Sequence, residues 1–119
     1  MALDCQLEQE YSEEEWRAFL QCAREGMKSG ERLHREFDAK MAQRHQSPRR
    51  VEKALSGGAG LVTYEDDGRP RLALWDPTSE LLVVATVPEG LVLTAFAVHA
   101  PRIDAYLRSF EKTRWLRRP

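Results

Sequence analysis

The chain has 119 residues and a formal net charge of −1, with 42% hydrophobic and 31% charged residues, values typical of one soluble globular domain. No apolar run approaches the ~20 residues that span a bilayer, and no basic region followed by an apolar core opens the chain, so neither a membrane span nor a signal peptide is expected. The two cysteines, Cys5 and Cys22, lack metal-binding spacing, which favours reduced thiols in a cytoplasmic protein.

The first predicted helix runs from Ser12 to Met27. Ser12 and Glu15 have the spacing of a capping box, in which each side chain accepts a hydrogen bond from the backbone of the other residue. Acidic residues in the first turn suit the positive end of the helix dipole. Apolar residues then recur at helical spacing and form one stripe that would face the core: Trp16, Phe19, Leu20, Ala23 and Met27.

Two further helices are predicted before the sheet. One covers residues 31–44, with Leu33, Phe37 and Met41 as a narrow apolar seam. The next begins with Ser47 as its cap and Pro48 as its first helical residue, and the glycine-rich residues 56–60 end it. This segment has no Gly-Lys-Ser/Thr ending, which argues against a phosphate-binding loop of that kind.

Four short apolar runs between Leu61 and Val98 predict the sheet. Turn signals at residues 66–68, 76–78 and 88–90 separate them. Strands joined by such short turns pair antiparallel, because a parallel crossover needs a dozen or more residues. We therefore expect a four-stranded antiparallel meander, with the helices of the first half covering one side of it.

A closing helix is predicted from Pro101 to about Lys112, followed by a tail, residues 115–119, that packs through Trp115 and is otherwise mobile. The predicted fold class is α+β: N-terminal helices packed on a four-stranded antiparallel meander, with a C-terminal helix. Residues 1–119 would form a single domain. Its parts are a helical part over 12–56, the sheet over 60–98, and the C-terminal helix and tail over 101–119.

Charge alternates along the chain in four blocks. Residues 1–31 and 54–101 are acidic, whereas residues 32–53 and 102–119 are basic. If the two basic blocks lie together in space, they form a local positive surface on a nearly neutral protein. If they do not, they are solvated helix surfaces, and the sequence leaves both interpretations open.

Four residues suit the cleavage of RNA without a metal. The three histidines lack metal-ligand spacing and no serine or cysteine nucleophile motif is present, so neither metal nor organic cofactor is expected. RNA cleavage needs proton transfer, which histidine performs near neutral pH, and hydrogen-bond donors for the phosphate, which arginine, threonine and tyrosine provide. The candidate catalytic residues are His34, Arg71, Thr94 and Tyr106. Each also fits an ordinary structural role in a helix or strand.

From His34 to Phe96 the chain resembles small toxins of the barnase–EndoU–colicin–RelE superfamily of ribonucleases, especially its phage-borne and bacterial polymorphic-toxin branches. Three stretches carry the resemblance. They are His34-Arg-Glu-Phe with Met41-Ala-Gln-Arg44, the segment from Arg44 to Leu55, and Trp75-Asp-Pro-Thr-Ser-Glu-Leu-Leu-Val-Val84 running on to Leu91-Val-Leu-Thr-Ala-Phe96.

The resemblance implies helices against a four-stranded sheet whose open side binds RNA in a cleft. By position, His34 would transfer protons, Arg71 would contact phosphate and Thr94 would donate to it, while Tyr106 matches more loosely as an aromatic hydroxyl. The chain departs from the pattern at His45, where glycine is usual, and in its acidic first helix. His99 directly follows the threonine strand, so it is a second candidate for the catalytic histidine.

Three hypotheses about function follow. The first is a toxin-like endoribonuclease that works through 2′-OH attack and a 2′,3′-cyclic phosphate; its partners would be RNA and a cognate immunity or antitoxin protein, with no membrane. The second, motivated by the near-zero net charge and the lack of a strict catalytic motif, is a non-catalytic α+β module that binds a protein. The third is an immunity or antitoxin protein that mimics nucleic acid, which fits the acidic start but not the basic blocks.

Overall fold

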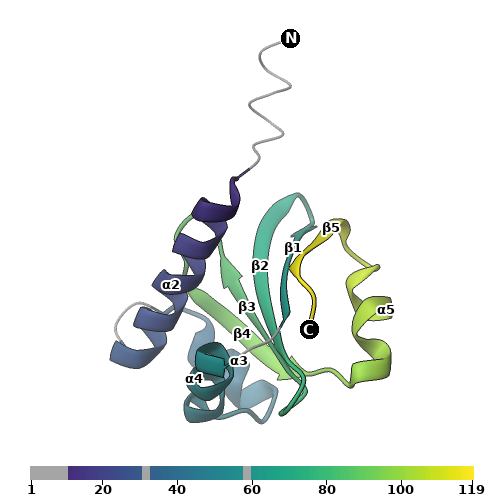
Figure 1. Cartoon of the computed structure of the whole chain (residues 1–119). Coiled ribbons are helices and arrows are strands. Elements are labelled where there is room, and N and C mark those ends of the chain that lie inside the picture. The colour runs from purple at the N-terminus through teal and green to yellow at the C-terminus, as the bar shows by residue number, and fades with distance from the viewer. Residues whose placement is uncertain (1–10, 31–32, 58–59) are drawn as a thin grey trace.

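The computed structural model describes residues 11–30, 33–57 and 60–119 of the chain. Within these ranges, three helices come first: α2 (Glu13–Ser29), α3 (Phe37–Gln43) and α4 (Pro48–Gly57). Four strands follow: β1 (Gly60–Asp66), β2 (Arg69–Asp76), β3 (Leu81–Thr86) and β4 (Val92–Ala97). The chain then forms a 3-10 turn η1 (Ala100–Arg102), helix α5 (Ile103–Leu107) and strand β5 (Glu111–Arg117). The predicted α+β class is confirmed (Figure 1).

Helix α2 begins as the sequence predicts. The Ser12 hydroxyl accepts a hydrogen bond from the Glu15 amide at 3.2 Å, and the Glu15 carboxylate accepts one from the Ser12 amide at 3.0 Å. At the other end Gly30 has a φ of +73°, the left-handed conformation in which glycine commonly ends a helix. Trp16, Leu20, Ala23 and Met27 are buried on one side of the helix.

Helix α3 is shorter than predicted. It begins at Phe37 rather than residue 31, and residues 31–32 lie outside the described part of the chain. Leu33 instead forms an isolated parallel bridge with Val92, and the His34 amide donates to the Val92 carbonyl at 3.1 Å. The edge of β4 offers unpaired backbone groups, and Leu33 and His34 pair with them instead of continuing a helix.

Helix α4 starts at the predicted proline. Pro48 is its first residue, and the Ser47 hydroxyl accepts a hydrogen bond from the Arg50 amide at 3.3 Å. Val51, Ala54 and Leu55 are buried, as the helical spacing predicts. The glycine-rich segment predicted to end this helix includes residues 58–59, which are outside the described part of the chain. Cys5 is outside it as well.

The sheet has five strands in the order β4-β3-β2-β1-β5, and each neighbouring pair is antiparallel. The predicted four-stranded meander is present, but it is not the whole sheet. The sequence predicts the end of a helix and then a tail for the last part of the chain. The structure instead has strand β5 there, and this strand pairs with β1. The predicted closing helix is also shorter, ending at Leu107 instead of Lys112.

Side chains pack on both sides of the sheet, which separates two apolar clusters. Helices α2, α3 and α4 cover one side, and α5 lies against the other (Figure 1). The expectation of an open side is therefore wrong, because Ile103 and Leu107 of α5 are buried there against Val62, Trp75 and Leu82. We call this second side the α5 side. No helix within the described ranges is long and apolar enough to cross a membrane.

Candidate functional site

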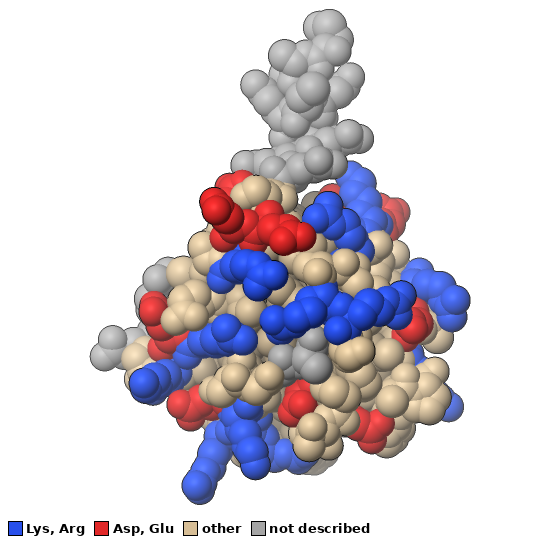
Figure 2. Space-filling model, viewed as in Figure 1, with Lys and Arg blue, Asp and Glu red and all other residues tan. Residues whose placement is uncertain are grey.

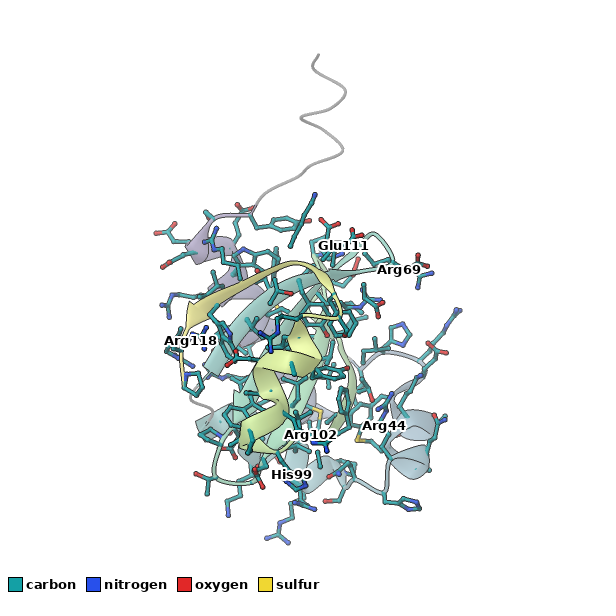
Figure 3. All side chains as sticks on the ribbon, turned by 90° about the vertical axis from the view of Figure 1, so that its right-hand side faces the viewer. Arg44, Arg69, His99, Arg102, Glu111 and Arg118 are labelled. Atoms are coloured by element: carbon teal, nitrogen blue, oxygen red, sulfur yellow. The ribbon has the colours of Figure 1, made fainter. Side chains whose placement is uncertain are left out.

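A groove of about 980 Å³ opens between the end of α3, the end of β4 and α5. A volume of this order can hold a nucleotide-sized ligand. Figure 3 shows Arg44, His99 and Arg102 gathered beside the lower end of α5. The residues that line the groove are Arg44, Phe96, Ala97, Val98, His99, Arg102, Ala105 and Tyr106. Among the residues that the structure describes, the lining is therefore cationic and aromatic and includes no carboxylate.

Arg44 reaches the groove from the C-terminal end of α3. Its guanidinium carbon lies 4.5 Å from the centre of the Phe96 ring, a cation–π contact. The Phe96 ring also meets Tyr106 edge-on, with 5.3 Å between ring centres. The aromatic pair thus fixes where the guanidinium of Arg44 sits at the wall of the groove.

Three buried side-chain atoms in the described ranges have no hydrogen-bond partner: Arg44 Nε, Gln46 Oε1 and Thr94 Oγ1. Arg44 and Gln46 lie just after the last residue of α3, and Thr94 lies in β4. Thr94 precedes Phe96 by two residues on β4, which places both side chains on the α5 side because strand side chains alternate. Buried polar atoms are nearly always paired, and an ordered water could pair atoms that are this enclosed.

The segment that follows β4 is held from two directions. The buried Trp75 indole donates to the Val98 carbonyl at 3.1 Å, and the Val98 amide donates to the Glu80 carbonyl at 2.9 Å. The next residue, His99, is exposed and has its Nδ1 3.1 Å from Glu80 Oε1. These hydrogen bonds hold the segment that carries His99 at the groove.

Two tyrosines belong to the apolar cluster of the α5 side, and one of them, Tyr106, also lines the groove. Burial raises the pKa of Tyr106, and Asp66 adds to the effect whereas Arg44 opposes it. Burial also raises the pKa of Tyr64, with further increases from Tyr106 and Asp66 and an opposing effect of Arg71. Both phenols thus stay protonated at neutral pH and can act as hydrogen-bond donors.

The structure places the four residues predicted from sequence as follows. Tyr106 lines the groove, whereas Thr94 is buried two residues before the lining residue Phe96 and does not itself line the groove. Arg71 is opposite Tyr64 in the β1–β2 pair and donates to the Pro70 carbonyl at 3.2 Å, outside the groove lining. His34 is beside the first residue of β4, whereas the groove is at the strand's last residues. The Nδ1 of His34 accepts a hydrogen bond from the Glu36 amide at 3.1 Å.

Sequence reasoning did not single out Arg44 and Arg102 as site residues. The signal that could have found them was the alternation of charge, because Arg44 belongs to the basic block of residues 32–53 and Arg102 to that of residues 102–119. The fold brings one arginine of each block to the same groove.

Charge of both signs is spread over the rest of the surface. Figure 2 shows Lys and Arg side chains in a band across the face seen in Figure 1, with acidic side chains near the start of α2 above it. A net charge of −1 therefore coexists with locally positive regions. Among the residues that the structure describes, no three His, Cys, Asp or Glu side chains come together as a metal site would require.

Compared with protein-family models, with curated proteins and with solved structures, the chain has no match.

Proposed function

We propose that the chain is a toxin-like endoribonuclease that binds RNA in the groove and cleaves it without a metal. The observation that carries the proposal is that Arg44, His99 and Arg102 come together on one groove with an aromatic wall. A phosphate oxygen is the acceptor that arginine binds most strongly, and Arg102 supplies a second cation on the same groove.

The other groove residues suit the chemistry of 2′-OH attack. His99 would take the proton of the 2′-OH, whose oxygen then forms the bond to phosphorus while the bond to the 5′ oxygen breaks. The leaving oxygen would take a proton from water through the open groove, and the product would be a 2′,3′-cyclic phosphate. Arg44 and the hydroxyl of Tyr106 would stabilise the charge that develops on the phosphate, whereas the Thr94 hydroxyl is buried behind the lining residues.

The aromatic surface of the groove suits RNA rather than a small anion. Bases of single-stranded RNA stack on aromatic rings and on guanidinium planes, and the groove wall contains both in Arg44, Phe96 and Tyr106. Such an enzyme would act in the cytoplasm, and a cognate immunity or antitoxin protein would inhibit it by covering the groove.

The test is cleavage of total RNA and a tRNA pool by purified protein in EDTA. We expect cleavage by the wild type and a loss of about 10²- to 10⁴-fold in His99→Ala, the usual contribution of a general base. Arg44→Ala should lose about 2 kcal/mol or more of binding, which is about 30-fold. Arg108→Ala is the matched control, because Arg108 has the same charge but does not line the groove.

Two results would contradict the proposal. If folded wild-type protein leaves RNA intact, the catalytic part is wrong, and RNA bound but uncut would leave a non-catalytic binding module. If Arg44→Ala and Arg108→Ala lose activity equally, the groove is not the site.

A further inference from the structure

Glu80 has an unusual backbone conformation for its residue type. It lies in the turn between β2 and β3, directly before Leu81, and has a φ of +55°. This left-handed region is favourable for glycine but strained for a residue with a side chain. Glycine or asparagine would adopt this turn conformation with less strain. The presence of a glutamate therefore points to a role of its side chain beyond forming the turn.

The explanation lies in what Glu80 contacts. Its carbonyl accepts a hydrogen bond from the Val98 amide at 2.9 Å. One carboxylate oxygen, Oε2, accepts from the Ala100 amide at 2.7 Å, and the other, Oε1, is 3.1 Å from His99 Nδ1. One strained residue therefore binds three consecutive residues at the end of the groove.

These contacts fix the protonation pattern of the histidine ring. The backbone hydrogen bond from Ala100, followed by the hydrogen bond from His99, lowers the pKa of the Glu80 carboxyl, so the group is a carboxylate at neutral pH. A carboxylate can only accept hydrogen bonds, and Nδ1 of His99 must therefore carry the proton. In the neutral ring this leaves the lone pair on Nε2, the other nitrogen.

The hydrogen bonds from Val98 and Ala100 stabilise this turn, but the contact with His99 adds little to stability. The His99 side chain is 73% exposed, and ion pairs at exposed sites contribute little to stability. A left-handed non-glycine residue costs more than such a pair commonly returns. The glutamate has another consequence, however, because the ring that it orients belongs to a histidine lining the groove.

We propose that Glu80 is a positioning residue for His99, holding the Nδ1–H tautomer and leaving Nε2 as the proton acceptor in the groove. The importance of this role for RNA cleavage rests on the proposed function, whereas the tautomer itself does not.

The test uses the ¹⁵N chemical shifts of the His99 ring in the full chain, above the pH at which the ring is protonated. The wild type should show a protonated Nδ1 and an unprotonated Nε2. Glu80→Gly relieves the backbone strain while removing the carboxylate, and it should move the ring toward the Nε2–H tautomer. Glu80→Gln, whose amide can still accept from Ala100, separates loss of the charge from loss of the backbone bond. Glu89→Gln, in the turn between β3 and β4 and outside the groove lining, is the control.

In the RNA assay Glu80→Gly should lower kcat at least about tenfold, part of the ~10²–10⁴ that a general base contributes, with KM nearly unchanged. A wild-type ring with protonated Nε2, or a tautomer unaffected by Glu80→Gly, would overturn the positioning role. An unchanged kcat would also overturn it. If the wild type cleaves no RNA, the proposed function fails, and the ¹⁵N shifts alone then decide whether Glu80 positions His99.

Discussion

The packing of α5 against the sheet can be tested by truncating Leu107. This side chain is 1% exposed and lies in the apolar cluster of the α5 side. Leu107→Ala removes three carbon groups, worth about 0.8 kcal/mol each in transfer free energy. With the cost of the cavity that remains, the free energy of unfolding should fall by about 3 kcal/mol.

Thermal and urea unfolding would measure this effect. An unfolding entropy of roughly 2.1 cal/mol/K per residue over 119 residues makes each kcal/mol worth about 4 °C, so Tm should fall by about 12 °C. Arg108→Ala, the next residue and exposed, should change stability by about 0.5 kcal/mol or less. A loss below about 1 kcal/mol for Leu107→Ala would refute the packing of α5 and restore an open side of the sheet.

Two further predictions concern neighbouring parts of the fold. A Cβ added at Gly60 would lie 2.8 Å from Cζ3 of Trp115, so Gly60→Ala should cost about 1–3 kcal/mol in urea unfolding; unchanged stability would contradict the packing of Trp115 of β5 beside β1. Burial raises the pKa of Tyr64 in the folded protein, so the unfolded chain loses the phenol proton at a lower pH. The contribution of the protonated phenol to folding stability is therefore complete below about pH 10 and is lost as pH rises through the higher folded pKa. Tyr64→Phe should reduce the loss of stability between about pH 8 and about pH 11, and equal losses in both proteins would show that the phenol is not buried.

The central sheet could be predicted because local signals specify it. Asp67 and Gly68, for example, have φ values of +53° and +76°, the conformations for which an Asp-Gly turn between strands is typical. β5 gave no such signal. Its seven residues include three basic ones and place Trp115 beside Leu116, so no alternation of apolar and polar residues marks a strand. It forms because β1 offers an edge to pair with.

The candidate site likewise combines residues that local sequence signals indicate with residues that only tertiary contacts bring together. Thr94 and Tyr106 were recognisable as hydroxyls within apolar elements, and the structure places both on the α5 side, at or beside the groove. Arg44 contacts Phe96, which is far from it in the sequence, and no local pattern predicts such a contact. His34 was placed in a helix, whereas pairing with Val92 at the sheet edge decides its position. Tertiary contacts of this kind override local preference.

The most direct measurement compares an RNA oligonucleotide with a DNA oligonucleotide of the same sequence, both incubated with the full chain in EDTA. The account predicts that the RNA is cut to products ending in a 2′,3′-cyclic phosphate. The DNA should stay intact, because it lacks the 2′-OH that attacks the phosphate. Cleavage of both strands, or RNA products with other ends, would contradict 2′-OH attack, and intact RNA would contradict the proposed ribonuclease activity.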